Sequence, residues 1–427
     1  MQHTKTVLAN GVKIITIPLE NSPTVSVAVL TGACPLREKK NNSGISHFLE
    51  HMCLSGSRKW PTVREVDIQV DDIGAITKGT TYKDSVLYGM KAHSKYAMQI
   101  TDMICDFFRF PALNSERIEK EKTVIFSEIE KRNESFQEKL FLDHSNLVYG
   151  DQPAGWLTTG EKEVIKSISK KQLLSYHTDN YVGDSTTFVI AGAGFDSEDV
   201  VLQVKEYFSD LPRESKTNSY FVEKEQSQAN LSFTKASLNQ IRLIIGFRAY
   251  PYGHPDSAAL AIIQMILGGS MSSRMFTKIR QEMGACYGIR SFINKNGCFG
   301  EAGTITAVAP ERISEVMEAL MEEYKRIVHK KVLQEEIERA KNLIISRIYM
   351  SLENISAYSG WYGWQGFFDQ DIISHAQREE QIKAVTAEDI QRVAKEVFAE
   401  NNLNVSFIGN ISDKQKEQLS KIITMNK

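Results

Sequence analysis

The sequence predicts an α+β fold made of two homologous α/β halves, each a mixed, mostly antiparallel sheet packed with helices. The chain has 427 residues and a mass of 48.2 kDa, more than one hydrophobic core usually supports, so at least two globular units are expected. An internal repeat, with strand-like and helix-like segments in the same order in both parts, supports this division. With 42% hydrophobic and 24% charged residues, the composition excludes a disordered or collagen-like chain.

The two halves begin in the same way. Residues 24–30 and residues 240–247 are runs rich in β-branched side chains, which indicates strands. Each run is followed by a helical segment and then by a hairpin-like region punctuated by glycine. We therefore expect one architecture to be used twice.

The repeat is clearest in two pairs of segments. Residues 116–129 are echoed by residues 335–348 at an offset of 219, and residues 165–173 by residues 382–390 at an offset of 217. Between the halves, Arg213–Ser219 is polar, turn-prone and free of aliphatic side chains, which predicts a junction near residues 215 to 225. The expected domains are therefore residues 1–215 and 216–427.

Composition also excludes several classes of function. The 51 Lys and Arg against 53 Asp and Glu give a net charge of -2, so no large positive field favours nucleic acid or an anionic membrane. No apolar run approaches the roughly 18–20 residues of a membrane span, and the amino terminus has neither signal-peptide nor transit-peptide character, so the cytoplasm is the expected location. The five cysteines contain no Cys-x-x-Cys pair and are expected to be reduced and mostly buried.

Two of the nine histidines, His47 and His51, stand at metal-ligand spacing in the segment Ser-His-Phe-Leu-Glu-His-Met. On a helix, the apolar residues of this segment face one side, while His47, Glu50 and His51 face the other. Because residues i and i+4 lie one turn apart, both imidazoles can reach a single ion. Residues 41–43 are expected to cap the helix start, and Gly56 follows its end. Three polar residues on a solvated helix face are the alternative interpretation.

A zinc site needs a further protein ligand, and the candidate is an acid on a separate element. Glu128 fits because it shares one helix face with Glu121, a face that we expect to lean inward. Seven residues correspond to a rise of about 10 Å, so one acid could bind the metal while the other holds a ligating histidine. The positions matched by the repeat are Ala340 and Arg347, which predicts one metal-binding half and one half without metal.

The pattern His47-x-x-Glu50-His51, followed much further along the chain by Glu128, resembles the inverted-zincin peptidases of the pitrilysin and insulinase family, peptidase family M16. The length is most similar to the short two-domain branch, which includes bacterial processing-protease-like enzymes and the β subunit of mitochondrial processing peptidase. The resemblance extends over nearly the whole chain, through residues 44–52, 121–128 and 273–287.

This resemblance implies one zinc ion per chain, bound by His47, His51 and Glu128. It further implies that Glu50 is the general base and that Glu121 holds a ligating histidine.

The resemblance also implies a clamshell whose two halves surround a peptide chamber, with the peptide added to an edge strand. The family places an arginine and a tyrosine seven residues apart in the second half, matched here by Arg280 and Tyr287. Their expected role is to stabilise the negative charge that develops on the substrate carbonyl. An exposed helix terminus for Arg280 and a strand core for Tyr287 are the structural alternatives.

Some segments depart from the pattern or invite other interpretations. Related enzymes usually have Asn-Ala in the hairpin after the metal helix, where this chain has Thr77 and Lys78, so the substrate preference is open. The aromatic segment 361–368 is expected to be core or chamber wall beside the second sheet. Cys53, directly after the motif, is expected to be structural.

The expected function is that of a zinc metalloendopeptidase that hydrolyses peptide bonds in unfolded peptides or presequence-like segments. The expected assembly is a homodimer or a heterodimer with a related chain. The alternatives are a non-catalytic peptide-binding or scaffold subunit of a heterodimeric processing peptidase, and a different metal hydrolase on another fold, which the internal duplication disfavours.

Overall fold

The computed structural model describes residues 3–216, 222 and 226–423. The chain forms two compact units. Unit 1 comprises Met1–Lys131, Trp156–Tyr220 and Ser351–Ser374, and unit 2 comprises Arg132–Gly155, Phe221–Met350 and His375–Lys427.

Unit 1 is built on a six-stranded sheet with the strand order β1-β2-β6-β3-β5-β4. The strands are β1 (Thr4–Val7), β2 (Lys13–Pro18), β3 (Thr24–Thr31), β4 (Ile76–Thr81), β5 (Val86–His93) and β6 (Thr186–Gly192). Strands β2 and β6 pair in parallel, and the other neighbours pair antiparallel. Nearly every residue of β2, β3 and β6 is buried, as expected for strands covered on both faces.

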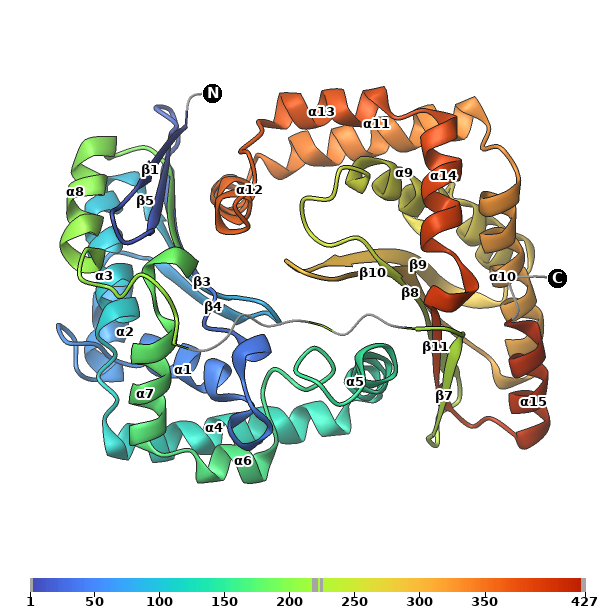
Figure 1. Ribbon diagram of the computed structural model, residues 1–427, viewed down its shortest axis with the longest axis horizontal. Coiled ribbons are helices and arrows are strands. Elements are labelled where there is room, and N and C mark those ends of the chain that lie inside the picture. The colour runs from blue at the N-terminus through green and yellow to red at the C-terminus, as the bar shows by residue number, and fades with distance from the viewer. Residues whose placement is uncertain (1–2, 217–221, 223–225, 424–427) are drawn as a thin grey trace. The chain divides into compact units, whose positions relative to one another are not determined.

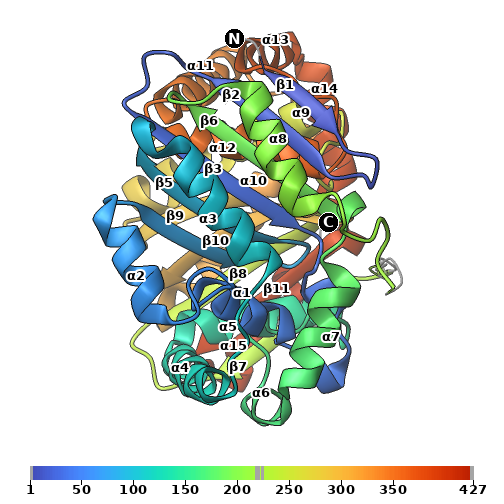
Figure 2. The same cartoon turned by 90° about the vertical axis from the view of Figure 1, so that its left-hand side faces the viewer.

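Helices of unit 1 cover both faces of this sheet. They are α1 (Ile45–Leu54), α2 (Val63–Asp72), α3 (Ala97–Arg109), α4 (Ser115–Glu134), α6 (Lys162–Ser167), α7 (Lys170–Asn180), α8 (Ser197–Phe208) and α12 (Ile355–Phe367). Helices α3 and α8 pack against each other and lie on one face (Figures 1 and 2), whereas α12 packs against β2, β3 and β6. Helix α1 packs against β4 and β5 at one edge of the sheet.

Unit 2 is built on a five-stranded sheet with the order β7-β11-β8-β10-β9. The strands are β7 (Asn230–Lys235), β8 (Ile241–Ala249), β9 (Cys286–Lys295), β10 (Gly300–Val308) and β11 (Leu403–Gly409). The helices are α5 (Phe136–Tyr149), α9 (Ser257–Gly268), a π-helical segment Phe276–Glu282, α10 (Ile313–His329), α11 (Gln334–Ser351), α13 (His375–Ala384), α14 (Ala387–Val397) and α15 (Asp413–Ile422). Helix α5 packs against β7, β8 and β11.

The expected repeat is confirmed by the topology. The order β2-β6-β3-β5-β4 in unit 1 matches β7-β11-β8-β10-β9 in unit 2, and in both sheets the first two strands of this series are the parallel pair. Strands β6 and β11 begin at Thr186 and Leu403, which are related by the same offset as the second pair of repeat segments. Two mixed, mostly antiparallel sheets packed with helices are therefore present, as the sequence predicts.

The compact units differ from the contiguous halves 1–215 and 216–427 in two segments. Residues 132–155, with α5, belong to unit 2, and residues 351–374, with α12, belong to unit 1. Helices α5 and α12 begin at positions that the repeat matches and pack on matching strands, so the exchange is symmetric within the repeat. The expected junction at 213–219 lies partly outside the described residues.

This exchange corrects the expectation for the aromatic segment 361–368. The segment lies in α12 and the turn after it, and it packs on the first sheet instead of the second. Tyr362 is buried there with Ile15, Leu30 and Val189. The repeat reveals matching elements, but the sequence carries no signal for the sheet that each element covers.

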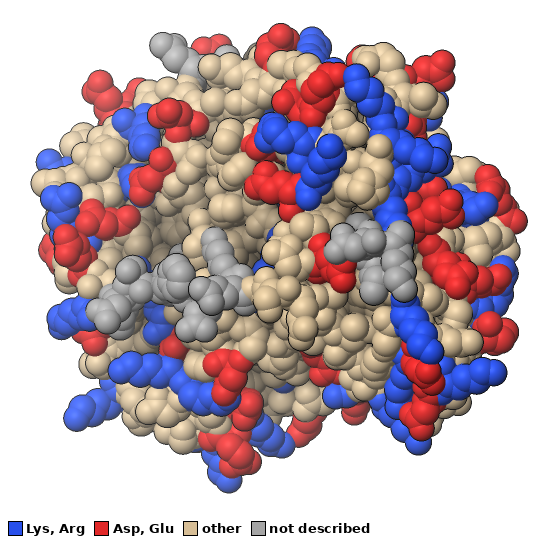
Figure 3. All heavy atoms as spheres, turned by 45° about the vertical axis from the view of Figure 1, so that its right-hand side comes forward, with Lys and Arg blue, Asp and Glu red and all other residues tan. Residues whose placement is uncertain are grey.

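Surface and cysteine properties agree with the sequence. On the face drawn in Figure 3, basic and acidic side chains are interspersed. None of the helices within the described ranges is long and apolar enough to cross a membrane. The five cysteines form no disulfide within the described residues, and four of them, Cys53 included, are buried.

Candidate metal centre

Helix α1 presents the His-x-x-Glu-His motif as the sequence predicts. Its apolar residues Ile45, Phe48, Leu49 and Met52 are buried in the core of unit 1. The imidazoles of His47 and His51 are half-buried on the other side of the helix, with their ring centroids 4.5 Å apart. The apolar face thus fixes the helix, and the polar face holds two imidazoles side by side.

The start of α1 differs from the expected cap at residues 41–43. The N-cap is Gly44, whose φ of 92° lies in the left-handed region that favours glycine. The buried carboxylate of Glu38 accepts hydrogen bonds from the backbone nitrogens of Gly44 (2.7 Å) and Ser46 (2.9 Å). Burial raises the pKa of Glu38 to about 7, although both hydrogen bonds oppose the shift. An acid from outside the helix therefore satisfies two of the free N–H groups at its start.

Glu128 of α4 meets both histidines of α1. Its Oε2 atom lies 3.7 Å from Nε2 of His47 and 3.7 Å from Nε2 of His51. Two zinc ligands on a tetrahedron with bonds of about 2.0–2.2 Å are about 3.3–3.6 Å apart, so both distances from Glu128 are close to those between two ligands of one zinc ion. The side chain of Glu128 is 43% exposed, so this acid faces a solvent-accessible site, contrary to the expected inward orientation.

Glu121 orients one of the two imidazoles. Its Oε1 atom lies 2.8 Å from Nδ1 of His51. The other ring nitrogen of His51, Nε2, is the one that faces Glu128. Burial alone would raise the pKa of Glu121, but the hydrogen bond with His51 and the charges of His51 and Arg117 outweigh burial and lower it. A proton on Nδ1 shared with this carboxylate leaves Nε2 unprotonated and available to a metal.

Glu50 lies beside the histidines but takes a different partner. The ligand atoms of His47, Glu50 and His51 all lie within 4.8 Å of one another. The Oε2 atom of Glu50 accepts a hydrogen bond from the Thr81 hydroxyl of edge strand β4 (3.1 Å). Burial raises the pKa of Glu50, with His51 and Thr81 opposing the shift. A raised pKa suits a carboxylate that must take up and return a proton.

Strand β4 approaches Glu50 closely at Gly79. A Cβ atom at this position would overlap Oε1 of Glu50, so a larger residue would force the carboxylate to move. Sequence reasoning does not single out Glu38, Gly79 or Thr81, because their contacts with α1 depend on how separate segments cross in space. Thr77 and Lys78 lie exposed on the same strand.

The second pair of predicted site residues lies in unit 2. Arg280, on the π-helical segment, is half-buried, and its guanidinium carbon lies 5.4 Å from the centroid of the Tyr287 ring. Tyr287, at the start of β9, is 88% exposed, so it is not a core residue of the strand. The structure brings these two residues together, and their action on a substrate stays a prediction.

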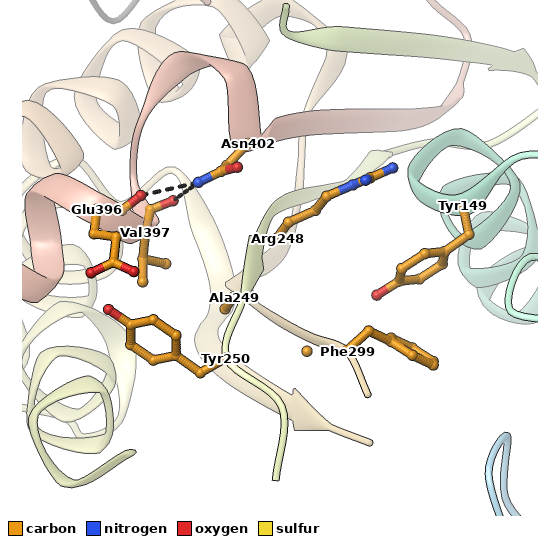
Figure 4. Close-up of a pocket in the computed structure, with 9 residues that line it drawn as sticks. Tyr149, Arg248, Ala249, Tyr250, Phe299, Glu396, Val397 and Asn402 are labelled. Atoms are coloured by element: carbon orange, nitrogen blue, oxygen red, sulfur yellow. Dashed lines mark hydrogen bonds between the residues drawn. The ribbon is translucent and has the colours of Figure 1, made fainter. Parts of the chain in front are cut away.

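A cavity of about 190 Å³ in unit 2 is lined by other residues (Figure 4). The guanidinium of Arg248 lies near the ring of Tyr149 and donates to the backbone oxygen of Val148. The Asn402 amide donates to the backbone oxygens of Glu396 (3.0 Å) and Val397 (3.2 Å). Nε and Nη1 of Arg248 make no hydrogen bond within the described residues. None of the residues of the His-x-x-Glu-His motif lines this cavity, and we assign the chemistry to the histidine cluster instead.

A duplicated α+β fold in which a distant glutamate meets a His-x-x-Glu-His helix is the arrangement of an inverted-zincin peptidase. Residues 13–158 match the model described as Insulinase (Peptidase family M16), and residues 167–344 match the model of the Peptidase M16 inactive domain. The chain therefore belongs to peptidase family M16, the insulinase family.

Curated relatives match over most of their length. An uncharacterized zinc protease of Bacillus subtilis, YmxG, is 26% identical and aligns over 92% of this chain and 95% of its own length. The β subunit of the mitochondrial-processing peptidase of Caenorhabditis elegans is 25% identical over 95% of this chain and 89% of its own.

Solved structures share the fold. A protease from Helicobacter pylori superposes with a TM-score of 0.87 at 20% identity, covering 96% of this chain and 99% of that chain. A peptidase M16 inactive domain from Pseudomonas fluorescens superposes with a TM-score of 0.86 at 16% identity, covering 96% of this chain and 99% of that chain.

Proposed function

We propose that this chain is a zinc-dependent endopeptidase in which His47, His51 and Glu128 hold one zinc ion. The observation that carries the proposal is the position of Glu128 Oε2 at 3.7 Å from the Nε2 atoms of both histidines. Two imidazoles and one carboxylate form a ligand set typical of catalytic zinc, which keeps a further position for water or substrate. Relatives whose names include zinc protease support the same metal.

The residues around the proposed zinc ion have separate proposed roles in peptide hydrolysis. A zinc ion held by the three ligands would supply Lewis acidity to water and to the peptide carbonyl. Glu50 takes the proton of the attacking water and returns a proton to the departing amine, because its carboxylate is buried beside the ligands and its pKa is raised. The Thr81 hydroxyl donates a hydrogen bond to one oxygen of Glu50. The hydrogen bond between Glu121 and Nδ1 of His51 fixes the tautomer of that imidazole.

The substrate is proposed to be an unfolded or presequence-like peptide. Strand β4 is an edge strand of its sheet, and it carries the Thr81 and Gly79 contacts to Glu50. Main-chain pairing along such an edge binds peptides without strict sequence demands. Arg280 and Tyr287 are proposed to donate to the substrate carbonyl as negative charge develops.

The competing function is a non-catalytic peptide-binding or scaffold subunit. The family model of the inactive domain matches residues 167–344, which include Ala340 at the position matched to Glu121. The metal ligands and Glu50 are intact in the other half of the repeat, within the residues matched by the peptidase model. This distribution favours one catalytic and one non-metal half in a single active chain.

Zinc content and peptide cleavage test the proposal. The purified chain is expected to carry about one zinc ion and to cleave a quenched fluorescent peptide. Glu50→Gln should retain the metal and abolish cleavage, because only the proton acceptor is removed. Absence of both zinc and cleavage in the unmodified chain would favour the scaffold subunit, and full activity of Glu50→Gln would remove Glu50 from its role.

We further propose that two chains associate, either as a homodimer or with a related chain. Several relatives are named as β subunits of a mitochondrial-processing peptidase. Light scattering of the purified chain tests the homodimer. Twice the mass of one chain would support a homodimer, and the mass of a single chain would contradict it and leave association with a related chain to be tested by mixing the two.

A further inference from the structure

A closed ring of polar contacts joins the end of α1 to the start of α4. Nδ1 of His51 lies 2.8 Å from Oε1 of Glu121, and the guanidinium of Arg117 pairs with the other carboxylate oxygen of Glu121. Arg117 also donates to the hydroxyl oxygen of Ser55 (3.2 Å). The Ser55 hydroxyl in turn donates to the backbone oxygen of His51 (2.7 Å), which closes the ring.

We propose that Arg117 is a positioning residue that acts through Glu121 and Ser55 to hold His51 in its metal-binding orientation. The inference rests on the proposed zinc site and extends it to a residue that touches no ligand atom. By occupying one oxygen of Glu121, Arg117 leaves the other oxygen aimed at Nδ1 of His51. A carboxylate with an ion pair at one oxygen and a hydrogen bond at the other resists rotation away from the imidazole, so Nε2 of His51 stays directed toward Glu128.

Burial makes the contribution of Arg117 substantial. The side chain of Glu121 is 4% exposed and that of Arg117 is 30% exposed. A charged carboxylate at this depth requires partners, because burial of an uncompensated charge is costly. Arg117 supplies the compensating charge from one turn earlier on the same helix, at the i,i+4 spacing.

The internal repeat provides a comparison within the same chain. At the offset of 219, Arg117 is matched by Glu336 and Glu121 by Ala340. Glu336 pairs with Arg274 in unit 2, with Nε of Arg274 at 2.7 Å from Oε1. The half that lacks the metal-site acids therefore also lacks the arginine, which associates Arg117 with the metal half specifically.

The test measures zinc retention in addition to activity. Zinc-loaded Arg117→Met is mixed with a chromogenic chelator at a temperature well below its unfolding midpoint. We expect zinc release about ten-fold faster than from the unmodified chain. Changing a residue that holds a metal ligand typically weakens metal binding by about 10-fold to 100-fold, and Arg117 acts one residue further out. Arg117→Lys, which keeps a cation near Glu121, should recover part of the loss. The matched control is Lys120→Met on the same helix, whose amine pairs with exposed Glu116.

A double variant separates positioning from a general structural role. If Arg117 acts through Glu121, Arg117→Met combined with Glu121→Gln should release zinc no faster than Glu121→Gln alone. The visible absorption of the cobalt-substituted protein should change in Arg117→Met and stay unchanged in Lys120→Met. Zinc release within two-fold of the unmodified chain, or additive losses in the double variant, would overturn the inference. An unmodified chain without zinc would instead contradict the proposed function and this inference together.

Discussion

Lys122 and Lys341, which the internal repeat matches to each other, make the same contacts in the two units. The buried amine of Lys122 lies 3.1 Å from the backbone oxygen of Lys166 and 2.9 Å from the carboxylate of Glu119. The amine of Lys341 lies 2.8 Å from the backbone oxygen of Lys383 and 3.5 Å from the carboxylate of Glu338. The repeat thus preserves an individual hydrogen bond between α4 or α11 and a later helix.

Helices α4 and α11 differ at the positions that form the candidate metal centre in unit 1. Arg117 stands one turn before Glu121, and Glu121 and Glu128 meet the histidines of α1. Arg347, the residue that the repeat matches to Glu128, instead donates to the backbone oxygen of Gly269. The contact that holds the fold is repeated, and the cluster that we propose to hold a metal occurs in unit 1.

Glu128→Gln should weaken zinc binding by at least about 100-fold. This loss exceeds the one expected when a residue that only holds a metal ligand is changed. The neutral amide replaces the anionic oxygen that lies 3.7 Å from both Nε2 atoms. The measurement is competition with a chelator of known affinity. Glu130→Gln is the control, because Glu130 is exposed on the same helix and pairs with Lys162. Equal zinc affinity in Glu128→Gln and the unmodified chain would exclude Glu128 as a ligand.

His177 should make the chain less stable as the solution becomes acidic. Burial lowers its pKa from 6.5 to about 4, and its Nε2 atom lies 2.9 Å from the Phe108 backbone oxygen. Because the folded-state pKa is the lower one, its stability contribution is complete above pH 6.5 and is lost as the pH falls toward 4. The shift corresponds to a loss of about 3 kcal/mol by pH 4.

Urea unfolding of the chelator-treated chain at pH 7 and pH 5 measures this dependence. His177→Gln keeps a donor for the Phe108 oxygen without a titrating ring, so its stability should fall less between the two pH values. Identical pH dependence in the variant and the unmodified chain would show that His177 does not titrate on unfolding.

Gly246→Ala should destabilise unit 2 by about 1–3 kcal/mol, the usual cost of overpacking. A Cβ atom at Gly246 would overlap Oε1 of Glu301 and lie 2.5 Å from Nε2 of His144. Those two atoms are 2.5 Å apart in a buried contact between α5 and β10, so the methyl group must separate them. Urea unfolding provides the measurement. Gly288→Ala is the control, since a Cβ atom at Gly288 meets nothing within 4 Å, and an equal loss in both variants would contradict the steric argument.

Arg280→Ala should lower kcat more than it raises KM in peptide cleavage. A donor to the developing oxyanion acts mainly in the transition state, and removing one costs about 10²–10³ in kcat. Steady-state kinetics on a quenched peptide separates the two constants. Arg290→Ala, exposed on β9, is the control and should leave both constants near their original values. A change confined to KM would assign Arg280 to substrate binding instead.

The sequence by itself determined the repeat, the two sheets and the identity of the histidine helix. These features follow from local periodicity and self-similarity: the apolar face of α1 and the near-constant offset between the repeated segments are visible without coordinates. The pairing of Glu121 with His51 and the approach of Glu128 are geometric outcomes that the structure supplies.

Only the tertiary structure decided which segments complete each unit and which side chains support α1. The exchange of α5 and α12, the Glu38 carboxylate at the start of α1, and Arg117 at its end all depend on long-range crossings of the chain. Periodicity reports which face of an element is apolar, but an acid or an arginine acquires its partner only when packing brings distant segments together.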